Sequence, residues 1–145
     1  MGNSLGRAMA GGLAGTVAMT MMMYGAGPMM GLHMDIAAML GSMMGGVWIL
    51  GLLAHLMLGV AVFPMIFAQG VLGRLPGPAV LQGVIFGVGL WLMQQAIVMP
   101  MMGFGIFSAN AGGMLAAVGA LMAHLIYGAL LGAIAAPALT RALRA

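Results

Sequence analysis

The stretch Val47-Trp-Ile-Leu-Gly-Leu-Leu-Ala-His-Leu-Met-Leu-Gly-Val-Ala-Val-Phe-Pro-Met-Ile-Phe-Ala68 decides the fold of this chain. It contains no Asp, Glu, Lys or Arg, and His55 is its only ionisable side chain. A helix of about 20 apolar residues is long enough to cross a lipid bilayer. We therefore expect Val47–Ala68 to be a transmembrane helix with a histidine near its middle.

Three further stretches have the same character, and they are Ala8–Gly27, Ala79–Met99 and Gly113–Ala136. Pro28 follows the first and Pro100 follows the third, and proline cannot continue a regular helix. Ser108 or Asn110 precedes the fourth stretch and could cap its N-terminus with a side-chain oxygen. The sequence thus predicts four transmembrane helices.

The composition excludes a water-soluble protein. Of the 145 residues, 64% are hydrophobic and 3% are charged, whereas soluble domains carry roughly 25% charged residues. The basic residues are four scattered arginines, so there is no patch that could hold the phosphates of a nucleic acid. The chain has no cysteine, which excludes disulfides and iron–sulfur clusters. We expect one integral membrane domain over residues 1–145, with the lipid bilayer as its main partner.

The arginines predict how the helices are oriented. All of them lie in the N-terminal segment, the loop between the second and third spans, or the C-terminal segment: Arg7, Arg74, Arg141 and Arg144. By the positive-inside rule, both termini and the middle loop are cytoplasmic. The loops over residues 29–46 and 101–112 then face outward. Asp35 is expected to cap a short outer-surface helix that runs to Met44.

The two halves of the chain resemble each other. A shift of 72 positions places Pro28 on Pro100 within the same Pro-Met-Met-Gly sequence, and a shift of 69 places His55 on His124 within Ala-His-Leu. We therefore expect an all-α, transmembrane four-helix bundle made of two tandem two-helix repeats, residues 8–72 and 79–140. Repeats of this kind are related by a pseudo-twofold axis along the membrane normal.

Small residues on the spans predict where helices pack. Glycine lets backbones approach closely, which is how helices associate inside a bilayer. Seven glycines recur at spacings that place them on one helix face: Gly11, Gly15, Gly51, Gly59, Gly83, Gly87 and Gly128.

His55 and His124 are the first candidate site. At 1.5 Å per residue they lie roughly 14 to 17 Å from the outer ends of their helices, near the centre of a bilayer core about 30 Å thick. Two imidazoles at one depth could ligate the two axial positions of a haem b and form an electron carrier. Alternatively, each neutral histidine hydrogen-bonds to a neighbouring helix, through Thr16, Gln94 or Tyr127 for example, and only specifies packing. The sequence leaves both interpretations open.

The second candidate site is on the outer side, where many of the 20 methionines cluster. Thioether sulfur is a soft ligand that favours Cu(I), so Met29, Met30, His33 and Met34 could form a copper-binding patch. Methionine also fills gaps in apolar packing, and a purely structural role explains the same residues.

No catalytic site is expected. Asp35 is the only side-chain carboxylate in the chain, so neither a Ser-His-Asp triad nor a pair of carboxylates can form. We expect a protein that is not an enzyme.

Taken together, several motifs resemble those of a known protein family. They are Gly27–Gly31, Trp48–Gly59, Val84–Met93, Val98–Gly103 and Ala123–Gly128. The family is one of small bacterial four-helix integral membrane proteins known only as a domain of unknown function. The resemblance covers nearly the whole chain and implies a multi-pass protein of the bacterial cytoplasmic (inner) membrane, but no activity.

Three functions follow as hypotheses. The first is a non-catalytic accessory or assembly subunit of a larger membrane complex, of the respiratory type, that packs against other membrane subunits. The second is a haem b electron carrier that uses His55 and His124. The third is a Cu(I)-handling protein that uses the outer methionines and His33.

Overall fold

A computed structural model describes residues 2–32 and 34–136, and all the regular secondary structure in these ranges is helical. His33, Arg141 and Arg144 lie outside the described residues. The main helices, in chain order, are α1 (Gly2–Met21), α2 (Gly27–Met29), α3 (Ile36–Ser42), α4 (Trp48–Met57), α5 (Phe63–Ile66), α6 (Ala79–Met93), α7 (Met99–Met101) and α8 (Gly113–Ala135).

Short π-helical turns join several of these helices into longer rods. The turn Met22–Ala26 joins α1 to α2, Leu58–Val62 joins α4 to α5, and Gln94–Val98 joins α6 to α7. A fourth π turn, Phe67–Val71, follows α5, and a 3₁₀ turn, Ile106–Ser108, precedes α8.

Three of the resulting helices are long and apolar enough to cross a membrane, which confirms three of the predicted spans. They are Trp48–Val71, Ala79–Met101 and Gly113–Ala135, of 24, 23 and 23 residues. The first predicted span, Ala8–Gly27, is helical throughout, but its glycines and threonines make it less apolar than the other three. That this helix also crosses the bilayer stays a prediction.

Prolines explain three of the π turns. Pro28, Pro64 and Pro100 each stand two residues after the end of a π turn. The residue before each proline donates its N–H to the carbonyl five positions back, Gly27 to Met22 for example. Proline has no N–H and its ring clashes with the preceding turn, and widening that turn accommodates the ring. The helix that contains Pro64 continues to Val71, whereas those that contain Pro28 and Pro100 end one residue after the proline, at Met29 and Met101, close to the ends that the sequence predicts.

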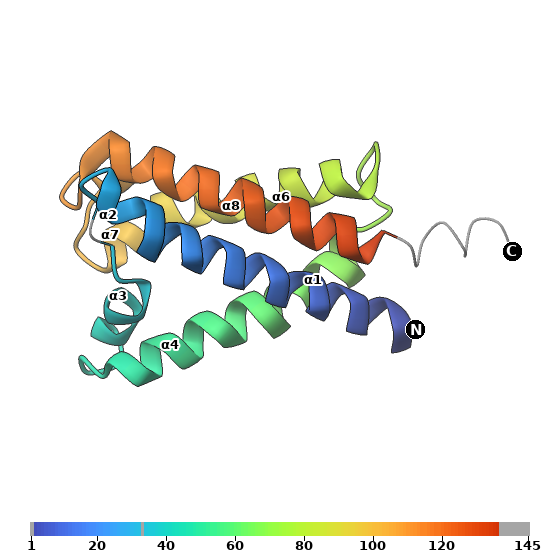
Figure 1. Cartoon of the computed structure of the whole chain (residues 1–145), viewed down its shortest axis with the longest axis horizontal. Coiled ribbons are helices and arrows are strands. Elements are labelled where there is room, and N and C mark those ends of the chain that lie inside the picture. Colours follow the sequence, from blue (N-terminus) through green and yellow to red (C-terminus); the bar gives the residue numbers. More distant parts are fainter. Residues whose placement is uncertain (1, 33, 137–145) are drawn as a thin grey trace, which may run out of the picture.

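Helix α8 is the centre of the packing, with α1 on one side and α6 on the other (Figure 1). Close backbone contacts make this possible. A Cβ on Gly83 would collide with the Gly128 carbonyl oxygen, and one on Gly87 with the His124 carbonyl. On the α1 side, a Cβ on Gly15 would lie 2.7 Å from the Tyr127 ring. No residue larger than glycine fits these positions without moving a helix.

The remaining predicted packing glycines also lie at helix contacts. Gly11 faces the backbone of Leu131 on α8, and Gly59 faces Thr16 on α1. Gly51 on α4 faces the backbone of α3 at Ala37. Helix α3 is therefore packed against α4 at one end of the molecule (Figure 1).

Helix α3 begins as predicted, because the Asp35 carboxylate accepts the N–H of Ala38 at 2.9 Å. The expected cap of the fourth span is wrong. Helix α8 starts after Gly112, without a side-chain cap. Ser108 instead donates to the side chain of Gln95, and Asn110 donates to a loop carbonyl.

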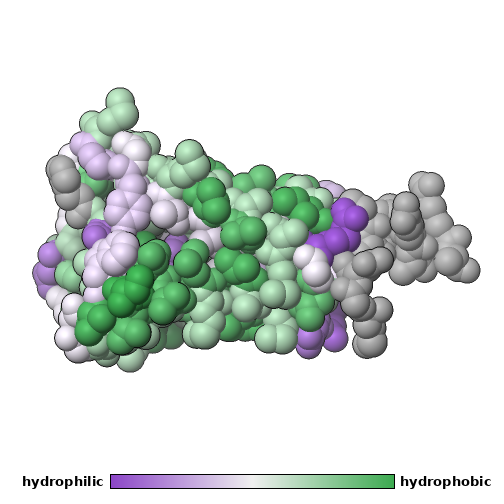
Figure 2. All heavy atoms as spheres, turned by 60° about the horizontal axis from the view of Figure 1, so that its bottom comes forward, coloured by the Kyte–Doolittle hydropathy of each residue, from purple (hydrophilic) through white to green (hydrophobic). Residues whose placement is uncertain are grey.

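The surface of the described residues has an apolar band between two more polar ends (Figure 2). Large apolar side chains on all the long helices are exposed, among them Leu53, Ile85 and Leu115 at 55%, 42% and 55%. Such a band is typical of a protein whose sides contact lipid.

Candidate ligand cavity between the helices

A cavity of about 130 Å³ lies between α1, α4, α6 and α8, with α3 beside it. Its walls are mainly apolar, and Leu90, Ala123 and Phe63 are typical members. His55 and His124 both line it, so the structure brings the two predicted histidines to one space. An apolar cavity with a few convergent polar groups is the usual form of a small-ligand site.

His124 is held by its own helix. Its Nδ1 lies 2.8 Å from the carbonyl oxygen of Ala120, one turn earlier in α8. A carbonyl can only accept, so Nδ1 carries the proton and Nε2 keeps its lone pair. A hydrogen bond of this kind to one ring nitrogen fixes a histidine as a ligand through the other.

His55 is 8% exposed and is held by a neighbouring helix. Its Nε2 lies 3.1 Å from the hydroxyl of Thr20 on α1. Either group can donate in this pair. If the imidazole donates from Nε2, its Nδ1 keeps a lone pair that is available to a ligand. A hydrogen bond from His55 to another helix is also what a role in helix packing requires. Thr20 is not one of the partners that the sequence suggested.

Four methionines line the same cavity: Met19, Met23, Met93 and Met102. They come from both halves of the chain, through α1, the turn after it, α6 and the residue after α7. Met19 is buried, whereas Met93 is 39% exposed and lies at the rim. Sequence reasoning placed its copper ligands elsewhere and missed this set, because no fixed spacing relates methionines on separate helices.

One polar atom at this cavity has no partner. Oε1 of Gln94 is buried and makes no hydrogen bond with the described residues. The neighbouring Gln95 turns away, and its Oε1 accepts the Ser108 hydroxyl at 2.9 Å. An unpaired buried carbonyl oxygen is costly unless a donor or a positive charge comes to it. Gln94 therefore gives the cavity a group that a hydrogen-bond donor or a cation could satisfy.

Comparison with known proteins gives a family but no function. Residues 2–142 match the family of unknown function DUF6789. This chain belongs to that family. The match confirms the prediction, made from the motifs, that the chain is a member of a family of unknown function. Neither the curated proteins nor the solved structures contain a match to the chain.

The outer methionine patch predicted for this DUF6789 member is only partly assembled. Met29 is 89% exposed and lies on neither cavity. Met30 and Met34 line a second, smaller cavity of about 30 Å³, together with Met22 and Met23. His33 lies outside the described residues. Met23 lines both cavities, which therefore adjoin.

The chain's only side-chain carboxylate is bound at the end of the bundle and does not line either cavity. Asp35 accepts the Tyr24 hydroxyl at 2.6 Å and the indole N–H of Trp48 at 2.9 Å, besides capping α3. Hydrogen bonds from Tyr24 and from the Ala38 N–H hold the pKa of Asp35 below its ordinary value. The central cavity is thus lined by imidazole, thioether and amide groups and by no carboxylate.

Proposed function

We propose that this protein is a non-catalytic accessory or assembly subunit of a larger membrane complex, and that it holds a ligand between His55 and His124. It would cross the bacterial cytoplasmic membrane four times, with both termini on the cytoplasmic side. The observation that carries the bound ligand is the convergence of the two histidines, from different helices, on one cavity that contains no carboxylate.

The fold supports the duplication on which this topology rests. The π turns Met22–Ala26 and Gln94–Val98 are 72 positions apart, and each is followed by its proline. The second pair of helices has diverged. Pro64 has Ala133 as its counterpart 69 positions later, and α8 is accordingly a continuous helix.

The position of the arginines supports the orientation. The start of α1, the loop between the second and third long helices, and the end of α8 lie at one end of the molecule (Figure 1). Arg7 donates from Nε to the carbonyl oxygen of Ile134 at 3.1 Å, which joins the first and last helices at that end. Arg74 lies in the loop there. Positive charge at this end of the bundle supports the proposal that it is the cytoplasmic end.

The accessory role is supported by what the helices leave uncovered. Among the described residues, no side chain and no neighbouring helix lies within 4 Å of the place that a Cβ on Gly89 of α6 would occupy, apart from its two chain neighbours, and Gly89 is exposed. A small residue on an outward helix face allows a helix of another protein to approach closely.

The accessory role is tested by purifying the protein from its native membrane in a mild detergent. We expect a stoichiometric larger partner that a Gly89→Leu substitution displaces without lowering the melting temperature of this chain. Ala133→Leu makes a comparable change on the exposed side of α8 and serves as the control, which should keep the partner. A wild-type protein that emerges alone from intact membrane would remove the accessory role.

Haem b is the second candidate. It is favoured because two histidines from different helices line the same cavity. Its test is an optical spectrum of the same preparation, oxidised and then reduced with dithionite. A bis-histidine haem gives a Soret band and a reduced α-band that His124→Gln abolishes. A featureless spectrum would exclude haem. The metal content of the preparation would then show whether the ligand is a metal ion.

A further inference from the structure

We propose that the ligand of the central cavity is a Cu(I) ion, held by soft donors from α1 and the π turn after it, α4, α6, the residue after α7, and α8. The ion would take its ligands from the thioethers of Met19, Met23, Met93 and Met102 and the imidazoles of His55 and His124, which all line the cavity. This inference rests on the proposed function only in that the cavity holds a ligand. It is independent of any partner complex.

The donor set selects the metal. Thioether sulfur binds Cu(I) and is a poor ligand for Mg²⁺, Ca²⁺ and Mn²⁺, which prefer carboxylates and carbonyls. Structural zinc sites use cysteine thiolates, alone or with histidines, and catalytic ones use three histidine, carboxylate or cysteine ligands, and this chain has no cysteine. The cavity offers thioethers and imidazoles with no carboxylate. Among biological metals this combination suits Cu(I).

Charge and size point the same way. Moving an ion into an apolar interior is expensive, and Cu(I) carries a single positive charge, whereas Zn²⁺, Mg²⁺ and Ca²⁺ are divalent. The unpaired Oε1 of Gln94 at the cavity stabilises positive charge. A dry protein cavity of about 150 Å³ holds one benzene molecule. A haem macrocycle is several times larger than benzene, so haem requires the helices around this cavity of about 130 Å³ to separate, whereas a metal ion does not.

The hydrogen bonds of the two imidazoles can leave one nitrogen of each ring available to a metal ion. The Ala120 carbonyl holds the proton of His124 on Nδ1 and leaves Nε2 as a donor to the metal. Thr20 can accept from Nε2 of His55, which leaves Nδ1 as the donor. Thr20 is then a positioning residue, because it acts on the metal only through His55.

The second cavity gives a route to this site from one end of the molecule. Met30 and Met34 line it near the loop between α2 and α3, and Met23 connects it to the central cavity. A sequence of thioethers allows Cu(I) to exchange between ligands of one kind. The outer methionines thus serve as a point of capture and the central set as the site where the ion is held.

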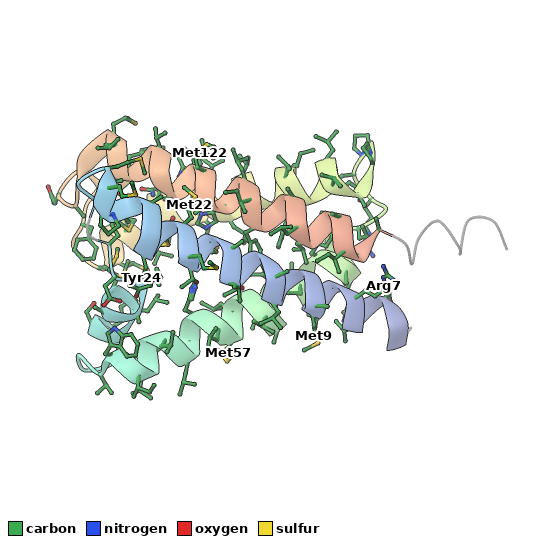
Figure 3. All side chains as sticks on the ribbon, in the orientation of Figure 1. Arg7, Met9, Met22, Tyr24, Met57 and Met122 are labelled. Atoms are coloured by element: carbon green, nitrogen blue, oxygen red, sulfur yellow. The ribbon has the colours of Figure 1, made fainter. Side chains whose placement is uncertain are left out.

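The test is an anaerobic titration of the purified full-length protein in detergent with Cu(I), in competition with a chromogenic Cu(I) chelator. We expect one ion per chain. Replacing Met19, Met23, Met93 and Met102 together by leucine, which conserves volume, should lower the affinity by more than about 10-fold to 100-fold, which is the loss caused by changing a residue that only supports a metal ligand. The matched control replaces Met9, Met57, Met65 and Met122 by leucine. These residues are 37%, 57%, 43% and 47% exposed and do not line the cavities, and Met57 and Met122 point away from the bundle (Figure 3).

Equal Cu(I) affinity in the two leucine variants would overturn the proposal, as would a wild-type protein that binds no Cu(I). X-ray absorption of the loaded protein must show both sulfur and nitrogen neighbours, and nitrogen or oxygen neighbours alone would also contradict it. A thermal melt of each variant shows whether the helices still pack. A Soret band that His124→Gln removes, without Cu(I) binding, would overturn the copper site while leaving a ligand between His55 and His124.

Discussion

The phenolic hydroxyl of Tyr127 donates to the carbonyl oxygen of Gly59 at 2.8 Å, and this bond joins α8 to the middle of the second long helix. In a regular helix, the Gly59 carbonyl would accept the N–H of Phe63, but Phe63 donates to Leu58 in the π turn. The next residue, Pro64, has no N–H to offer. Tyr127 therefore supplies the donor that the proline withholds from this buried carbonyl.

The first prediction follows from that relationship. Tyr127→Phe leaves a buried carbonyl unpaired, which should lower the free energy of unfolding in detergent by about 1 to 3 kcal/mol. Pro64→Ala restores an N–H to the helix at the right place. We expect Tyr127→Phe to cost clearly less in the Pro64→Ala background, as a double-mutant cycle would measure. Equal costs in both backgrounds would show that Tyr127 contributes only by packing.

The second prediction concerns the glycines between α6 and α8. A Cβ on Gly83 would meet the carbonyl of Gly128, so Gly83→Ala should destabilise the protein by about 1 to 3 kcal/mol. Gly89 lies on the same helix and has open space around it. Gly89→Ala should stabilise by about 0.5 to 1 kcal/mol, because alanine is the better helix former. Melting temperatures of the two variants test the packing of α6, and a loss of stability in both would contradict it.

The third prediction is a dependence on pH at the end of the bundle that carries α3. Hydrogen bonds from Tyr24 and the Ala38 N–H lower the pKa of Asp35 from its ordinary value of 3.8. A carboxyl whose pKa is lower in the folded state stabilises that state above the unfolded pKa, and this stabilisation is lost as the pH falls through the folded pKa. The contact with Trp48 should therefore persist at about pH 5 and be lost only well below about pH 4.

Tryptophan fluorescence can follow this change, because the indole of Trp48 donates to Asp35. An acid titration of the wild-type protein should show a transition below about pH 4. Asp35→Asn can still cap a helix but does not titrate, so its fluorescence should lack the transition. The same transition in both proteins would assign it to another part of the molecule.

Much of this fold could be predicted from sequence patterns that act locally. Uninterrupted apolar runs such as Val47–Ala68 predict membrane-spanning helices because length and hydropathy alone decide them. Gly83 and Gly87 were predictable as contacts because helical spacing puts them on one face. Asp35 could be identified as a cap because its position before an apolar run fixes its hydrogen bond.

Features that depend on two distant segments could not be predicted. The bond from His55 to Thr20 depends on the rotation of α1 against α4, and nothing in either segment fixes that rotation. Ser108 was expected at a helix start, but it lies in a turn with positive φ and donates to Gln95. The convergence of Met19 and Met102 on one cavity likewise depends on how four helices are placed together.

The last prediction separates capture of Cu(I) from its retention. Met30 and Met34 line the smaller cavity and are absent from the walls of the central one. Replacing both by leucine should therefore slow the uptake of Cu(I) and leave the equilibrium affinity unchanged within about twofold, since the central donors remain. Stopped-flow mixing with a Cu(I) chelate measures uptake, and the leucine variant of Met57 and Met122 is the control. If the affinity falls as far as it does in the central methionine variant, Met30 and Met34 bind the retained ion and the two cavities act as one site.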